Sequence, residues 1–226
     1  EKFSLFMFTS CGWFFDDIGG IEASQVLLYA ARALQLARDI DGVDRTGGFL
    51  RLLRQAPGNT GEAPDGAAVY RRTVAPARVD AERAAAHIAL VSLTGLPADD
   101  PPGLRLTDTD RYAARRRADT LALGTAHVTD RATGRTSSRS YLAVRRQAEA
   151  PRCWIGANRS DPYLELVQLF HTQGAMAVEQ AMAAREPAFG LEGLLGDDRR
   201  RLKAAQALAD RIDLVMAFIR RSGIAP

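Results

Sequence analysis

Cysteine and histidine are scarce in this chain of 226 residues. The two cysteines, Cys11 and Cys153, lie far apart in the sequence, and the three histidines are His87, His127 and His171. Neither set has the spacing of a disulfide framework or of a zinc site. We therefore expect no metal, no cofactor and a reducing, cytoplasmic setting.

Long apolar runs and concentrated positive charge are also missing. No run approaches the roughly 18 apolar residues of a membrane span, and no charged leader precedes a signal-like core. The formal net charge is +3, and all but two of the 30 cations are arginine. The arginine runs at 115–117 and 199–201 are interpreted as solvated helix faces. These features favour partners other than membranes or nucleic acids.

The common catalytic motifs are absent as well. The chain has no phosphate-binding Walker loop, no dinucleotide-binding G-x-G-x-x-G, no H-E-x-x-H and no G-x-S-x-G. An independent enzyme is therefore the least favoured functional class. We assign no catalytic residue.

Apolar residues recur at helical spacing over much of the chain. Residues 21–39 are predicted to form a strongly amphipathic helix. The positions on its apolar stripe are Ile21, Val26, Leu27, Ala30, Ala33, Leu34 and Ala37. Further helices are predicted at 48–55, 77–93, 164–185 and 198–221. Pro76 is expected to begin the second of these, because proline is tolerated in the first turn of a helix.

The middle of the chain changes to a strand pattern. Residues 121–129 and 138–146 are rich in Thr, Val, Tyr and Leu, and a turn sequence separates them. We predict a hairpin there, with a third strand near 153–155. The predicted fold class is α+β, mainly helical: a helical bundle carrying a small antiparallel β-hairpin or sheet. Residues 1–226 are taken as one domain, with the hairpin inserted at about 119–156.

The densest chemistry lies in TSCGWFFDDIGGIE, residues 9–22. One alternative is a ligand site, in which Trp13 and Phe14 stack on a sugar ring or another flat ligand and Asp16 and Asp17 accept bonds from hydroxyl groups. In the structural alternative, the rings fill the core beneath the long helix, and one aspartate caps its N-terminus. Adjacent aspartates are a poor catalytic pair, because glycoside hydrolysis needs carboxylates roughly 5 to 9.5 Å apart.

His87 falls on the helix predicted at 77–93, with Asp80 and Arg83 on the same side. A hydrogen-bonded core histidine and a ligand-binding residue behind the aromatic cluster are both compatible with this position. His127 and His171 are interpreted as surface residues.

Two segments carry a resemblance to a known family. They are FTSCGWFFDDIGGIEASQVLLYAARALQLA and NTGEAPDGAAVYRRTVAPARVDAERAAAHIALVSL. Both resemble a bacterial domain of unknown function found C-terminal to the barrel of glycoside hydrolase family 57-like proteins, which are alpha-amylase/alpha-mannosidase-like. DPYLELVQLF and FGLEGLLGDDRRRL resemble it more faintly. The resemblance implies a chain that belongs to a larger protein with a catalytic barrel upstream.

The resemblance also implies a function. Family 57 enzymes act on α-glucans with retention, through a glutamate and an aspartate on the barrel, and no residue here matches the motifs that hold them. We expect an accessory domain that packs on the barrel and lines one wall of an α-glucan cleft. The expected substrate-binding residues are Trp13, Phe14, Asp16, Asp17 and His87. The parent would be a glycoside hydrolase or glucanotransferase, with this chain alone not catalytic. The alternative is a structural or protein-interaction domain with no ligand site.

Overall fold

The computed structural model describes residues 1–14, 16–59, 63–94, 98–147, 149–157, 164–183 and 188–195. Two compact units make up the chain, Glu1–Val79 and Asp80–Pro226. The helix predicted at 198–221 lies outside the described residues. The assignment of residues 1–226 to one domain stays a prediction.

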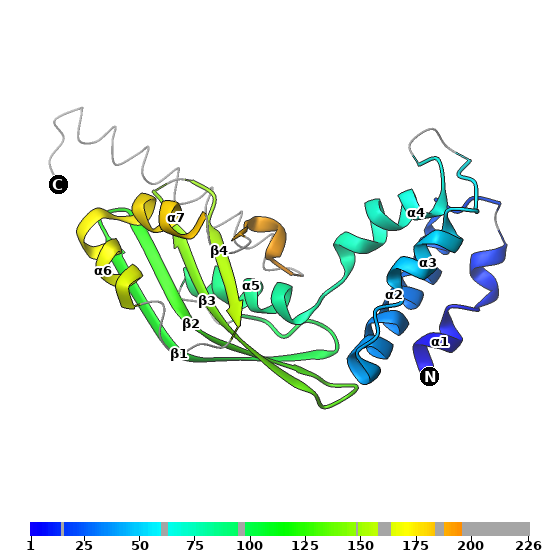
Figure 1. Cartoon of the computed structure of the whole chain (residues 1–226), viewed down its shortest axis with the longest axis horizontal. Helices are drawn as coiled ribbons and strands as arrows, with labels where there is room; N and C mark the ends of the chain where they lie inside the picture. Colours follow the sequence, from blue (N-terminus) through cyan, green and yellow to red (C-terminus); the bar gives the residue numbers. More distant parts are fainter. Residues whose placement is uncertain are drawn as a thin grey trace, which may run out of the picture. The chain divides into compact units, whose positions relative to one another are not determined.

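The first unit is built from helices (Figure 1). They are α1 (Lys2–Phe6), η1 (Ser10–Trp13), α2 (Ile21–Asp41), α3 (Thr46–Leu53), α4 (Gly66–Val69), the π-helix η2 (Tyr70–Val74) and η3 (Ala75–Ala77). The long helix predicted at 21–39 is confirmed as α2, and the one predicted at 48–55 is confirmed as α3. Pro76 is the middle residue of the short η3, and the prediction that it begins the helix at 77–93 is wrong, because Asp80 starts that helix by accepting a hydrogen bond from the Arg83 N–H.

One face of α2 forms the core of the first unit. Its buried residues are Ala23, Leu27, Ala30, Ala31 and Gln35. Leu27 and Ala31 pack with Val69, Tyr70 and Val74. Ile21, which the sequence placed on the buried stripe, is 85 % exposed. The helix has apolar residues on more than one face, so periodicity alone did not decide which face is buried.

The second unit is an antiparallel sheet with helices on both faces (Figure 1). Among the described residues, the sheet has five strands in the order β1-β2-β3-β4-β5. They are β1 (Leu104–Arg116), β2 (Asp119–Asp130), β3 (Thr136–Arg145), β4 (Arg152–Ala157) and β5 (Ala188–Phe189). The helices are α5 (Ala81–Ser92), α6 (Leu164–Gln173), α7 (Ala175–Ala183) and η4 (Leu191–Gly193).

Successive side chains of the strands enter two different apolar layers. On one face, Ala122 and Tyr141 pack with the buried side of α5. On the other, Leu142 and Trp154 pack with α6 and α7, where Phe170 is fully buried. Because both faces are covered, β3 carries a run of five buried residues at 140–144, and β2 carries three at 120–122 before its burial alternates.

The predicted fold class is therefore wrong: the chain is α+β, but not a helical bundle carrying a small hairpin. The sheet forms the centre of the second unit, and its first strand, β1, has 13 residues. The sequence hid this strand because β1 is an edge strand with mostly exposed side chains, and its register shifts between Thr109 and Tyr112. Arg115 and Arg116, interpreted as part of a helix face, lie on β1.

Candidate functional site

The aspartates of the opening stretch lie in the turn that leads into α2. The Asp17 carboxylate accepts a hydrogen bond from the Gly19 N–H at 2.9 Å, and the Asp17 carbonyl accepts one from Gly20 at 3.1 Å. Gly20 is the N-cap of α2, so no side chain caps the helix directly. Asp17 therefore shapes the turn before the helix, and the capping role predicted for one of the aspartates is wrong for α2.

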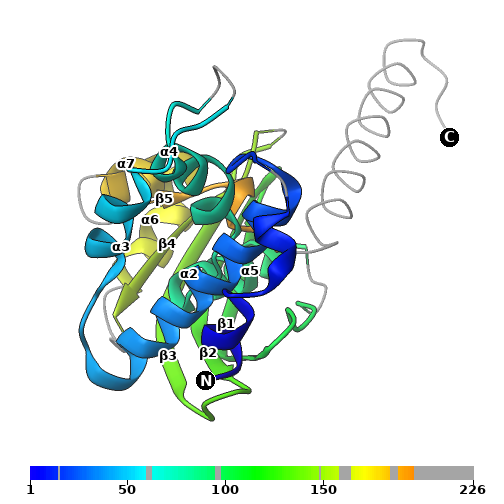
Figure 2. The same ribbon diagram turned by 90° about the vertical axis from the view of Figure 1, so that its right-hand side faces the viewer.

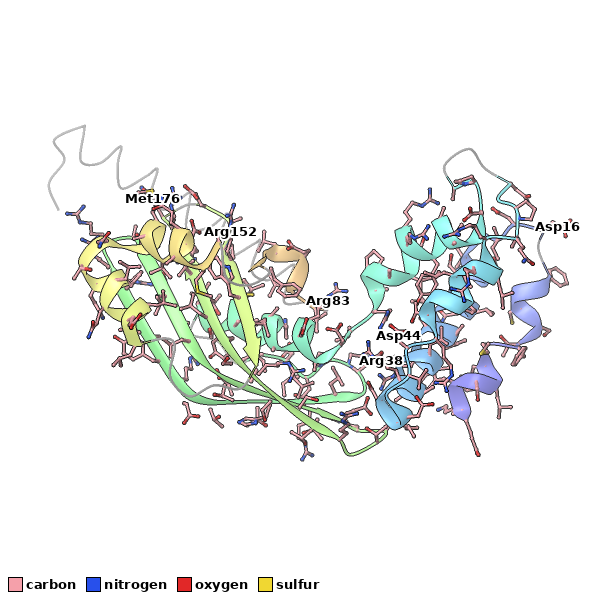
Figure 3. All side chains as sticks on the ribbon, in the orientation of Figure 1. Asp16, Arg38, Asp44, Arg83, Arg152 and Met176 are labelled. Atoms are coloured by element: carbon pink, nitrogen blue, oxygen red, sulfur yellow. The ribbon has the colours of Figure 1, made fainter. Side chains whose placement is uncertain are left out.

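Phe14 and Asp16 lie at the surface of the same turn. The Phe14 side chain is 81 % exposed, so it does not fill the core beneath α2. Asp16 is also exposed, and Figure 3 shows its side chain at the periphery of the first unit. The Asn59 amide donates a hydrogen bond to the Asp16 carbonyl, which ties the turn to a distant loop. An aromatic ring and a carboxylate are thus presented to solvent by an anchored backbone.

Trp13 and His87 complete the set of predicted substrate-binding residues. Trp13 is the last residue of η1, and its side chain lies outside the described atoms. His87 lies on α5 in the second unit, where it is 1 % exposed and its Nδ1 accepts a hydrogen bond from the Leu195 N–H at 3.2 Å. These contacts favour the core-histidine alternative, because Nδ1 is occupied by the backbone. Its ligand role stays a prediction.

A pocket that the sequence analysis missed lies beside this turn. Its volume is about 400 Å³, and its lining residues are Phe6, Thr9, Cys11, Ile21, Glu22, Gln25, Val26 and Tyr29. Figure 2 shows α1 running beside α2, the two helices that supply most of this lining. The spacing of Ile21, Gln25 and Tyr29 at four-residue steps was a signal for a second functional face of α2.

Glycine at position 12 lets η1 approach α2 at Val26, which lines this pocket. A Cβ added to Gly12 would lie 3.2 Å from Val26 Cβ and only 2.6 Å from Val26 Cγ2, and the second distance is shorter than real Cβ contacts. Valine has few rotamers, so Val26 could not easily move aside. The pocket therefore depends on close packing of two backbone segments.

A second polar group lies on the sheet, away from the predicted site. The Tyr141 hydroxyl lies 2.9 Å from each Asp108 carboxylate oxygen and is buried under α5. Burial raises the pKa of Asp108, against the lowering effects of the Tyr141 bond and of the Arg111 and His127 charges. Gly124 leaves room for the pair, since its added Cβ would lie 2.7 Å from the Tyr141 oxygen. The arrangement holds β1 to β3.

Asp108→Asn should flatten the dependence of stability on pH. The folded-state pKa of Asp108 is raised, so the folded chain binds this proton more tightly than the unfolded chain does. Stability is then highest below the ordinary value of 3.8 and falls as the pH rises through the folded pKa. Asparagine keeps an oxygen for Tyr141 and removes the titration. Urea unfolding at a series of pH values should show that the stability of Asp108→Asn, relative to the native chain, increases as the pH rises across this window. A stability difference that does not change with pH would contradict the raised pKa of Asp108.

Two further features concern cations and membranes. Among the described residues, no three His, Cys, Asp or Glu side chains come together in a way that could hold a metal ion. A search of the same residues finds no helix with the length and apolar character needed to cross a membrane.

Comparison with known protein families gives a match over most of the chain. A family model described as "Domain of unknown function (DUF3536)" matches residues 1–190, which cover the first unit and the second unit as far as β5. The chain belongs to this family, and the predicted resemblance to a domain of unknown function is confirmed. No curated protein and no solved structure shows significant similarity to the chain.

Proposed function

We propose that this chain is an accessory domain of a bacterial, cytoplasmic, glycoside hydrolase family 57-like protein. In this role it packs on a catalytic barrel and lines one wall of a cleft that binds an α-glucan. The parent protein acts as a hydrolase or glucanotransferase, with its catalytic residues on the barrel. The chain itself contributes binding, through the turn between η1 and α2.

The exposed turn carries this proposal. Phe14 presents an aromatic face to solvent, and Asp16 presents a carboxylate two residues later. A sugar ring has an apolar face that stacks on an aromatic side chain and hydroxyl groups that donate to a carboxylate. The bonds from Asn59 and within the Asp17 turn hold the backbone in place, which lowers the ordering cost of binding.

The test is a titration of the purified chain with maltoheptaose, followed by tryptophan fluorescence. The chain has two tryptophans, and Trp154 is buried in the sheet layer, so a ligand-induced change reports on Trp13. We expect saturable binding with a Kd of about 1 mM, because one wall of a cleft supplies only part of the contacts. Phe14→Ala and Asp16→Asn should each weaken binding by roughly threefold to tenfold.

Two controls make this titration decisive. Cellohexaose, a β-linked glucan of similar composition, should produce a smaller change if the turn selects the α-linkage. Leu52→Ala replaces an exposed apolar residue of α3 and should leave binding unchanged. A folded chain that shows no saturable response to maltoheptaose, or equal affinity in the Phe14→Ala variant, would remove the glycan role and leave the interaction-domain alternative.

A further inference from the structure

Large apolar side chains are exposed at the start of the first unit. Leu5, Phe8 and Ile21 are each at least 66 % exposed. A stable helical surface normally presents polar residues to water, and a group of exposed apolar side chains marks an interaction site. This face of the first unit therefore has the character of a contact surface.

The pocket of about 400 Å³ opens on this face. Its walls are largely apolar: Phe6 and Tyr29 lie with ring centroids 5.3 Å apart, and Val26 and Ile21 complete the sides. Exposed apolar groups beside a pocket mark a protein interaction site. Ile21 is exposed and lines the pocket, and the exposed Leu5 and Phe8 are sequence neighbours of the lining residues Phe6 and Thr9. This pattern is typical of a protein interface, in which one anchor side chain fills a pocket at its centre.

The charge of this face points to the chemistry of the partner. Residues 8–31 contain three carboxylates, Asp16, Asp17 and Glu22, and no lysine or arginine, although the whole chain carries +3. Among the described residues that line the pocket, Glu22 alone is charged. The nearest cations in the sequence lie over aromatic rings of α1: the Lys2 ammonium is 5.5 Å from the Phe6 centroid, and the Arg32 guanidinium carbon is 6.0 Å from the Phe3 centroid. A partner would therefore meet an apolar pocket whose lining carries the Glu22 carboxylate.

We propose that this face docks a segment of the catalytic barrel, which inserts one large apolar side chain into the pocket and pairs an adjacent Arg or Lys with Glu22. The inference rests on the proposed function, because an accessory domain needs a surface for its catalytic partner, and it names that surface and the segment's chemistry. Ile21 and Tyr29 contact the anchor, and Glu22 selects the flanking cation.

The experiment is selection of a displayed library of short random peptides against the intact chain. Enriched peptides should combine Trp, Phe, Leu or Ile with an adjacent Arg or Lys. Ile21→Asp should weaken the best synthetic peptide by at least about tenfold. Ile40→Asp is the matched control, because Ile40 lies on the same helix, is 80 % exposed and does not line the pocket. Glu22→Arg should change the preferred flanking residue from basic to acidic.

Cys11 provides an independent readout. Its thiol is exposed and lines the pocket, whereas burial raises the pKa of the Cys153 thiol and keeps it unreactive in the folded chain. A bound peptide should slow the alkylation of Cys11 by iodoacetamide. Failure to enrich peptides, undiminished binding by Ile21→Asp, or enrichment of peptides without a cation would overturn the proposal.

The two proposals fail in different ways. If the docking face binds protein and the turn binds glycan, maltoheptaose binding should persist in Ile21→Asp, and peptide binding should persist in Asp16→Asn. If the selected peptides show no preference for an apolar residue beside a cation while maltoheptaose still binds, the docking proposal is wrong and the proposed glycan-binding function stands. Protection of Cys11 by maltoheptaose and not by peptides would show that the pocket belongs to the glycan site, which also overturns the protein partner.

Discussion

Replacing Trp154 with alanine should lower the free energy of unfolding of the second unit by about 3–5 kcal/mol, the range for deleting a large aromatic side chain from a core. Trp154 lies on β4, pairs in register with Leu142 on β3 and is 1 % exposed. It packs in the layer that contains Phe170 and Val178 of α6 and α7. Its removal would leave a cavity between the sheet and both helices.

Urea unfolding followed by far-UV circular dichroism measures this loss. Trp154→Phe should cost much less than alanine, because it keeps an aromatic ring and deletes an indole N–H that finds no acceptor among the described residues. Leu164→Ala, an exposed position on α6, should change stability by less than about 0.5 kcal/mol. An alanine loss below about 1 kcal/mol would mean that α6 and α7 do not pack on the sheet.

The fold was predictable where one pattern dominated a segment. The period of residues 21–39 identified α2, and the strand-forming composition of 121–129 and 138–146, with a turn sequence between them, identified β2 and β3. β1 was missed because its exposed, arginine-rich side chains carry no apolar alternation, and the shift near Asp110 breaks what period there is. An edge strand is specified by its partner's backbone hydrogen bonds, which a single-sequence pattern does not contain. The predicted fold class was wrong because this edge strand was missed.

The candidate site was predictable only in part. Residue chemistry located the turn that holds Phe14, Asp16 and Asp17, because aromatic and acidic residues beside glycines are unusual at such density. The pocket was not predictable from the sequence alone, since it exists only where η1 and α1 pack against α2. His87 had two alternatives, and its bond from Leu195, 108 residues away, is a tertiary contact that helical spacing does not reveal.

Gly12→Ala should disable both proposed functions of the first unit at once. The new Cβ would lie 2.6 Å from Val26 Cγ2, so η1 must move away from α2. Overpacking of this kind costs about 1–3 kcal/mol. The shift would move Cys11 out of the pocket lining and displace the turn that carries Phe14. We expect peptide binding and maltoheptaose binding each to weaken by about tenfold or more, with the second unit's unfolding unchanged.

A second substitution separates loss of geometry from loss of fold. Val26→Ala removes both Cγ atoms, including the one 2.6 Å from the new Cβ, and leaves only Val26 Cβ at 3.2 Å, so the double variant should recover most of the binding and the native alkylation rate of Cys11. Gly47→Ala is the control for changing a glycine, because its added Cβ meets nothing within 4 Å. If the single variant binds normally, η1 and α2 are not closely packed in solution. If only one function is lost, the pocket and the turn are held by different contacts, and the close approach at Gly12 governs just one of them.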